Sequence, residues 1–177
     1  EAQFYRAFDF VDGPIDLGDV MAELIGTQAA GFYNPETNEM NVLLLSGDTI
    51  EDSLPLLERI TYSHEYVHAL QDEAFDLQAY LEDINSVDNP DRALAMLSLV
   101  EGDATLVMQE YTLQDVITNP QDAMSLLDSN ILAAAEIPPG TPFILEAELT
   151  MPYLTGMEFV ALLRQEGGWE AVNAAFD

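Results

Sequence analysis

The sequence predicts a mostly α-helical α+β domain with two long helices and one small β-hairpin. Apolar side chains recur at helical spacing through residues 53–82 and 91–115. Between residues 31 and 46, turn-forming residues separate two short runs of strand-forming residues. The chain has 177 residues, of which 49% are hydrophobic, and this suffices for one domain with a buried core. We therefore expect residues 1–177 to form a single domain.

Helix boundaries follow from capping residues, prolines and glycines. Ser53 is a plausible N-cap for the first long helix, with Pro55 in its first turn and a break near Ala74. A loop is expected at 83–91, where Asp91 begins the second long helix. Further helices are expected at residues 2–11, 17–29, 120–135, 152–166 and 168–176. The chain begins with glutamate instead of methionine, so we expect a fragment or a processed form of a longer chain.

Charge and composition restrict the partners. The chain has 33 acidic residues, four arginines and no lysine, and its formal net charge is −29. Such a surface repels phosphate backbones and anionic lipids, so nucleic acid is an unfavourable partner. No apolar run reaches the length of a membrane span. The chain has no cysteine, so neither a disulfide nor a thiolate ligand is available. The acidic, lysine-free composition favours a secreted or cell-envelope location, and it leaves the oligomeric state open.

The chemistry is concentrated in the first long helix. The only two histidines of the chain, His64 and His68, are four residues apart and so share one helix face. Zinc accepts two such imidazole nitrogens at about 2.0–2.1 Å. Glu65 lies one step round the helix, where it can reach a water on the metal without itself binding the ion. The two histidines continue an apolar stripe, and buried imidazoles need partners that a shared ion would supply.

A third protein ligand must be an aspartate or a glutamate. Glu101 is the preferred candidate, because it interrupts an apolar stripe of the second long helix, and a metal ion would offset the cost of burying its charge. Gly102 would allow the two long helices to approach closely. Asp103 lies on a second apolar stripe and is the competing ligand, although it is more favoured as a partner of a ligand. The pattern therefore predicts one catalytic Zn²⁺ held by His64, His68 and a carboxylate, for which Glu101 is preferred to Asp103.

These motifs resemble those of a known class of enzymes. HEYVH at 64–68 and EGDAT at 101–105 resemble the zinc metallopeptidases called gluzincins, in which a glutamate on a following helix completes the HExxH site. Most of the chain also resembles a family of uncharacterised bacterial HExxH proteins, through GFYNPET, HEYVHALQDEAFDL, DRALAMLSLVEGDAT and PYLTGMEFV. The resemblance implies a zincin-like, gluzincin-like core with two metal-binding helices. Thr105 replaces the aspartate of thermolysin-like members, so Asp72, Asp103 and Thr105 are candidate partners of the ligands. Related sequences also continue past Asp177.

The resemblance implies peptide-bond hydrolysis by a metal-activated water. Glu65 would act as general base and pass the proton to the leaving amine. A donor must stabilise the oxyanion, and with no third histidine a tyrosine is the natural candidate. Tyr153, after Pro152 at a predicted helix start, is preferred to Tyr33 and Tyr66.

Several alternatives remain open. The resemblance implies that the hairpin aligns a polypeptide substrate along its edge, but a hairpin that only covers the core is equally consistent with its composition. The chain is also consistent with an inactive zinc-binding interaction module, or with a zinc hydrolase of a non-peptide amide or ester. The sequence does not distinguish endopeptidase from aminopeptidase action.

Overall fold

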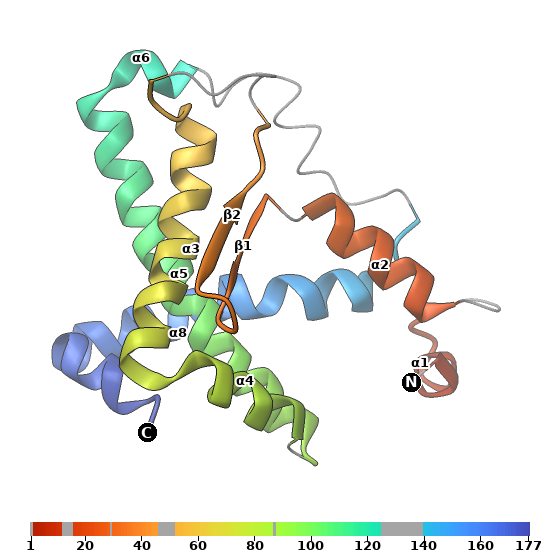
Figure 1. The fold of residues 1–177 in the computed structure, drawn as a ribbon. Helices are drawn as coiled ribbons and strands as arrows, with labels where there is room; N and C mark the ends of the chain where they lie inside the picture. Colours follow the sequence, from red (N-terminus) through yellow and green to blue (C-terminus); the bar gives the residue numbers. More distant parts are fainter. Residues whose placement is uncertain (1, 12–15, 29, 46–51, 87, 125–139) are drawn as a thin grey trace.

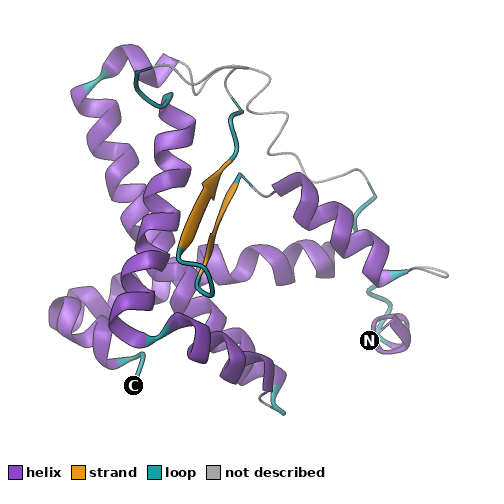
Figure 2. Ribbon diagram, in the orientation of Figure 1, coloured by secondary structure: helices purple, strands orange, loops and turns teal. Residues whose placement is uncertain are grey.

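The structure is a computed structural model that describes residues 2–11, 16–28, 30–45, 52–86, 88–124 and 140–177. The elements are α1 Ala2–Ala7, α2 Leu17–Gln28, β1 Gly31–Asn34, β2 Glu39–Val42, α3 Leu56–Phe75, α4 Leu77–Ser86, α5 Pro90–Thr118, α6 Pro120–Ala123 and α8 Phe143–Ala174 (Figure 2). The described chain is thus mostly helical with one two-stranded antiparallel sheet, as predicted.

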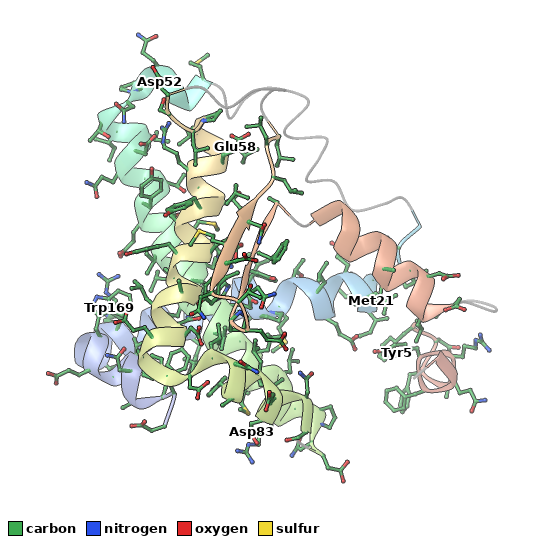
Figure 3. The ribbon with its side chains drawn as sticks, in the orientation of Figure 1. Tyr5, Met21, Asp52, Glu58, Asp83 and Trp169 are labelled. Atoms are coloured by element: carbon green, nitrogen blue, oxygen red, sulfur yellow. The ribbon has the colours of Figure 1, made fainter. Side chains whose placement is uncertain are left out.

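Helix α5 is the central element and packs against α3, α4 and α8 (Figure 1). The larger hydrophobic core joins these helices. Its buried members are Leu77, Leu99, Val100, Leu106, Val160, Val172 and Phe176. A second, smaller cluster joins α1 and α2 to the first turns of α8, and it includes Tyr5 and Met21 (Figure 3). The residues with the chemistry of interest lie on α3, α5 and α8 and therefore on the helices that form the larger core.

The predicted hairpin is confirmed and lies against α3. Its strands pair from Gly31 opposite Val42 to Asn34 opposite Glu39. A Cβ atom at Gly31 would lie 2.8 Å from both the backbone oxygen of Asn41 and Cγ2 of Thr61, so only glycine permits this close approach to α3. After β2, the backbone N–H of Leu45 donates to the buried carboxylate of Glu58 on α3 over 2.8 Å. The hairpin is therefore attached to the helix that carries both histidines.

The first long helix is interrupted near the predicted position. Asp76 separates α3 from α4 with a left-handed φ of 56°, two residues after Ala74. The prediction of Ser53 as N-cap was wrong: α3 begins at Leu56, and Pro55 occupies the cap position without a side-chain hydrogen bond. The reason is that proline disfavours helical backbone at the residue before it, so the helix cannot begin before Pro55.

The predicted loop at 83–91 was also largely wrong. Helix α4 continues to Ser86, and α5 already begins at Pro90. The side chain of Asn89 caps α5 by accepting a hydrogen bond from the backbone N–H of Arg92 at 3.1 Å. Acidic residues are compatible with an exposed helix as well as with a loop, and this explains the wrong boundary.

The last helix is longer than predicted at its start. Helix α8 begins at Phe143, so Pro152 is a buried residue inside it and not its first turn. The predicted bend is confirmed, because Gly167 and Gly168 leave helical geometry and Gly168 has a φ of 68°. Of the helix predicted at 120–135, α6 covers Pro120–Ala123, and residues 125–139 lie outside the described residues. Within the described part of the chain, no helix has the length and apolar character of a membrane span.

Candidate metal centre

Two helices bring two imidazoles and one carboxylate to a common point. His64 and His68 lie on α3, Glu101 lies on α5, and their candidate ligand atoms all fall within 4.8 Å of one another. His64 Nε2 is 3.2 Å from Glu101 Oε2 and 3.1 Å from His68 Nε2, and the third side of this triangle is 3.5 Å. Three atoms bound to one tetrahedral zinc at about 2.0–2.2 Å lie roughly 3.3–3.6 Å apart. The triangle is thus already close to the size that a zinc ion requires.

The electrostatics of this cluster suit a cation. Burial raises the pKa of Glu101, but hydrogen bonds with His64 and His68 and their charges outweigh burial and lower it to about 2. Burial lowers the pKa of His68, but the hydrogen bond and the charge of Glu101 outweigh this effect and raise it. Without a metal, positive charge on His68 would therefore balance the carboxylate. A divalent cation between the three groups would take over that role.

Glu65 lies beside the triad of His64, His68 and Glu101 and is 6% exposed. Its carboxylate accepts a hydrogen bond from the backbone N–H of Tyr33 on β1, so the hairpin orients it. Burial raises the pKa of Glu65, against the opposing charges of His64 and His68. A carboxylate with a raised pKa is a stronger base than an exposed one, and this is the property that a general base needs.

Tyr153 also reaches the triad, although from the middle of α8 and not from a helix start. Its ring stacks on His64 with the centroids 6.0 Å apart, and its hydroxyl donates a hydrogen bond to Glu101. Burial, together with the charges of Glu101 and Glu65, raises the pKa of Tyr153, so its hydroxyl stays protonated at neutral pH. It is therefore available as a hydrogen-bond donor beside the triad.

The two tyrosines that the sequence disfavoured are occupied elsewhere. The hydroxyl of Tyr33 donates to Asp72 over 2.7 Å, and burial and this bond raise its pKa to about 12. Tyr66 is 49% exposed and stacks on Tyr62 with ring centroids 6.1 Å apart. Tyr33 contacts the site through its backbone N–H, which donates to Glu65.

The three predicted partners of the ligands have different surroundings. Asp72 accepts from Tyr33 and from the backbone N–H of Leu77, so it supports the hairpin and the start of α4. Asp103 accepts from the side chain of Gln71 over 2.9 Å, and Gln71 in turn contacts His68. Thr105 has a buried hydroxyl without a hydrogen-bond partner among the described residues.

The residue that contacts Nδ1 of His68 was missed by sequence reasoning. It is Gln71, whose Oε1 lies 2.9 Å from His68 Nδ1. A signal for it was present, because residues three apart on a helix are neighbours on its surface and Gln71 follows His68 by three. Asp72 has the equally favourable spacing of four residues from His68 and an ionisable side chain, so the same signal also indicated Asp72.

Gly102 serves a different contact from the one predicted. It was expected to allow α3 and α5 to approach, but it faces Gly156 on α8. A Cβ atom at Gly102 would lie 2.2 Å from the carbonyl carbon of Gly156, so the two backbones touch. Glu101 precedes Gly102, and Tyr153 lies one turn before Gly156. This crossing of α5 and α8 therefore brings Glu101 and Tyr153 to the two histidines.

Comparisons with protein-family models, with curated proteins and with solved structures found no match to this chain. What the fold and the site define is a mostly helical protein with a His64–His68–Glu101 cluster that could hold a metal ion.

Proposed function

We propose that this chain is a zinc-dependent peptidase in which His64, His68 and Glu101 hold one ion and Glu65 is the general base. The observation that carries the proposal is the triangle of 3.1, 3.2 and 3.5 Å between the three candidate ligand atoms. The chain has no cysteine and only two histidines, so the third protein ligand must be a carboxylate. Two nitrogens and one oxygen leave a fourth position for water, as catalytic zinc sites do.

The residues around the triad support hydrolysis over storage of the ion. A bound zinc ion would polarise a carbonyl group and lower the pKa of water toward about 7. Glu65 would take the proton of the attacking water and deliver it to the leaving amine. Tyr153 would donate a hydrogen bond to the oxyanion, for which its protonated hydroxyl beside Glu101 is suited. A binding module has no need for this base and donor beside the ligands.

The edge of β1 that pairs with no other described strand supports a polypeptide as the substrate. The bond from Leu43 N–H to the oxygen of Ala30 sets the ladder, so the main-chain groups of Gly31 and Tyr33 point away from β2. Tyr33 N–H points at Glu65 on that side. An extended peptide that pairs with this edge would pass beside the general base.

The test compares metal content and activity in three proteins. Wild type should contain about one zinc per chain and cleave unfolded proteins or fluorogenic peptides. Glu101→Ala should lose the zinc, because two imidazoles are one fewer than the three protein ligands that hold a catalytic zinc ion. Glu65→Gln should keep the zinc and lose cleavage by two or more orders of magnitude, about what a general base contributes.

The matched control is Glu73→Gln, which makes the same change at an exposed position of α3. It should keep both zinc and activity. Zinc binding by wild type without cleavage of any peptide or unfolded protein would overturn the peptidase assignment. Unchanged zinc content in Glu101→Ala would overturn the metal site.

A further inference from the structure

Gln71 lies behind the histidine pair and has every polar atom occupied. It sits on α3, three residues after His68, and is 2% exposed. Its Oε1 is 2.9 Å from His68 Nδ1. Its amide nitrogen donates to the backbone oxygen of Val100 over 3.0 Å and to Asp103 Oδ2 over 2.9 Å. Both acceptors lie on α5, so the amide connects the two helices of the metal site.

These partners allow one orientation of the amide. A backbone carbonyl can only accept, so the group that faces Val100 must be the NH₂ and not the oxygen. The second N–H of this group meets the Asp103 carboxylate, which is again an acceptor. A flipped amide would put its oxygen against two buried oxygens, and would cost about 1–3 kcal/mol for each group left unpaired. The amide oxygen must therefore face His68.

The orientation of the amide determines the tautomer of the histidine. The amide oxygen has no proton to give, so His68 Nδ1 must carry the hydrogen of the 2.9 Å bond. A neutral imidazole has only one N–H, and its other nitrogen is then an acceptor with a free electron pair. This other nitrogen is Nε2, which points at His64 and Glu101.

We propose that Gln71, held by Asp103 and the backbone oxygen of Val100, is a positioning residue that keeps His68 in its Nδ1–H tautomer and so prepares Nε2 to bind the metal. This inference rests on the proposed metal site. His64 differs, because its Nδ1 is buried without a hydrogen-bond partner among the described residues. Of the two imidazoles, His68 is thus the one whose Nδ1 has an acceptor among the described residues that favours the tautomer with a free Nε2.

The first test observes the tautomer without any metal. Imidazole ¹⁵N chemical shifts of the metal-free wild type are measured at alkaline pH, where neutral histidine predominates. The chain has only two histidines, and the His64→Gln variant tells their signals apart. His68 should show a protonated Nδ1 and an unprotonated Nε2. A protonated Nε2 in neutral His68 would overturn the inference, whether or not the protein proves to be an enzyme.

The second test measures zinc affinity in Gln71→Met, which keeps the length of the side chain and removes its hydrogen bonds. The dissociation constant for zinc should rise 10–100-fold, the usual effect of losing such a partner. Asp103→Asn should stay within a few-fold of wild type, because an asparagine oxygen can still accept from Gln71. Gln78→Met is the matched control, since the side chain of Gln78 donates to exposed Glu82 at 3.3 Å on the surface of α4, and it should leave affinity unchanged.

The outcomes separate this inference from the proposed function. Equal zinc affinity of wild type and Gln71→Met would overturn the role of Gln71 and leave the metal site standing. A wild type that binds no zinc would overturn the proposed function, and the tautomer measurement would still decide the role of Gln71. Thermal melting of metal-free Gln71→Met tests whether the variant folds. If the variant does not fold, the ¹⁵N measurement on wild type still decides whether His68 has the predicted tautomer.

Discussion

The contact between Gly102 and Gly156 makes a sharp prediction about the Gly102→Ala variant. A Cβ atom at 102 would lie 2.2 Å from the carbonyl carbon of Gly156, 2.4 Å from its oxygen and 2.7 Å from the backbone nitrogen of Met157. All three atoms belong to the backbone of α8, so no side-chain rotation can relieve the overlap. The only relief is for the helices to separate.

The magnitude follows from ordinary contact distances. Carbon atoms in contact lie about 3.5–4.0 Å apart, so α5 and α8 must separate locally by roughly 1.3 Å or more. Overpacking of a well-packed core costs about 1–3 kcal/mol, and a backbone overlap belongs at the upper end of that range. Alanine offsets about 1 kcal/mol through its helix propensity. The net loss of about 2 kcal/mol should lower the thermal midpoint by about 4–8 °C in a chain of this size.

The assay is thermal unfolding of the metal-free protein followed by circular dichroism, with zinc affinity measured on the same variants. Gly18→Ala is the matched control, because the one described atom that its Cβ would meet is the side-chain oxygen Asp16 Oδ1 at 3.3 Å. This control should be as stable as wild type or slightly more stable. The zinc affinity of Gly102→Ala should also fall, since Glu101 adjoins the crossing. A Gly102→Ala protein that melts at or above the wild-type temperature would refute the close helix crossing.

Three further predictions concern charge and metal. Burial raises the pKa of Glu65 above its usual 4.5, so the contribution of Glu65 to stability is favourable below pH 4.5 and is lost as the pH rises through the raised value. Metal-free Glu65→Gln should therefore melt higher than wild type at pH 7 and no higher at pH 4, and a lower midpoint at pH 7 would contradict the burial of this charge. The pKa of Glu101 falls from 4.5 to about 2, which corresponds to about 3 kcal/mol of stability that is present above pH 4.5 and lost as the pH falls toward 2. In urea titrations at pH 5, metal-free Glu101→Gln should be less stable than wild type by this order. Equal stability of the variant and wild type at pH 5 would refute the ion pairing with the histidines. Zinc at 100 times its dissociation constant should stabilise wild type by about 2.7 kcal/mol, which raises the thermal midpoint by roughly 5–11 °C, and chelation should reverse the shift. An equal shift in Glu101→Ala would place the ion elsewhere.

Much of the candidate site could be predicted because its signals are local. Two histidines four apart must share a helix face wherever that helix packs, and a glutamate beside the first must lie next to that face. Glu101 was identifiable because a carboxylate inside an apolar stripe needs a compensating partner. The hairpin followed from turn-forming residues between two short strand-forming runs.

Other features depended on packing between segments distant in sequence. Gly102 was recognised as a point of close approach, but its partner is Gly156 and not a residue of α3. The role of Gln71 depends on acceptors that α5 contributes. Tyr153 was proposed for a helix start, although α8 begins at Phe143 and presents it from the interior of the helix.

The sequence by itself determined the mostly helical composition, the hairpin and the spacing that puts His64 and His68 on one side of a helix. The tertiary structure alone decided that Glu101, Tyr153 and the backbone of Tyr33 meet them there. The physical reason is range. Helical spacing and turn chemistry act over a few residues and are encoded by residues close together in the sequence. The choice of packing partner, in contrast, depends on steric fit between backbones many residues apart.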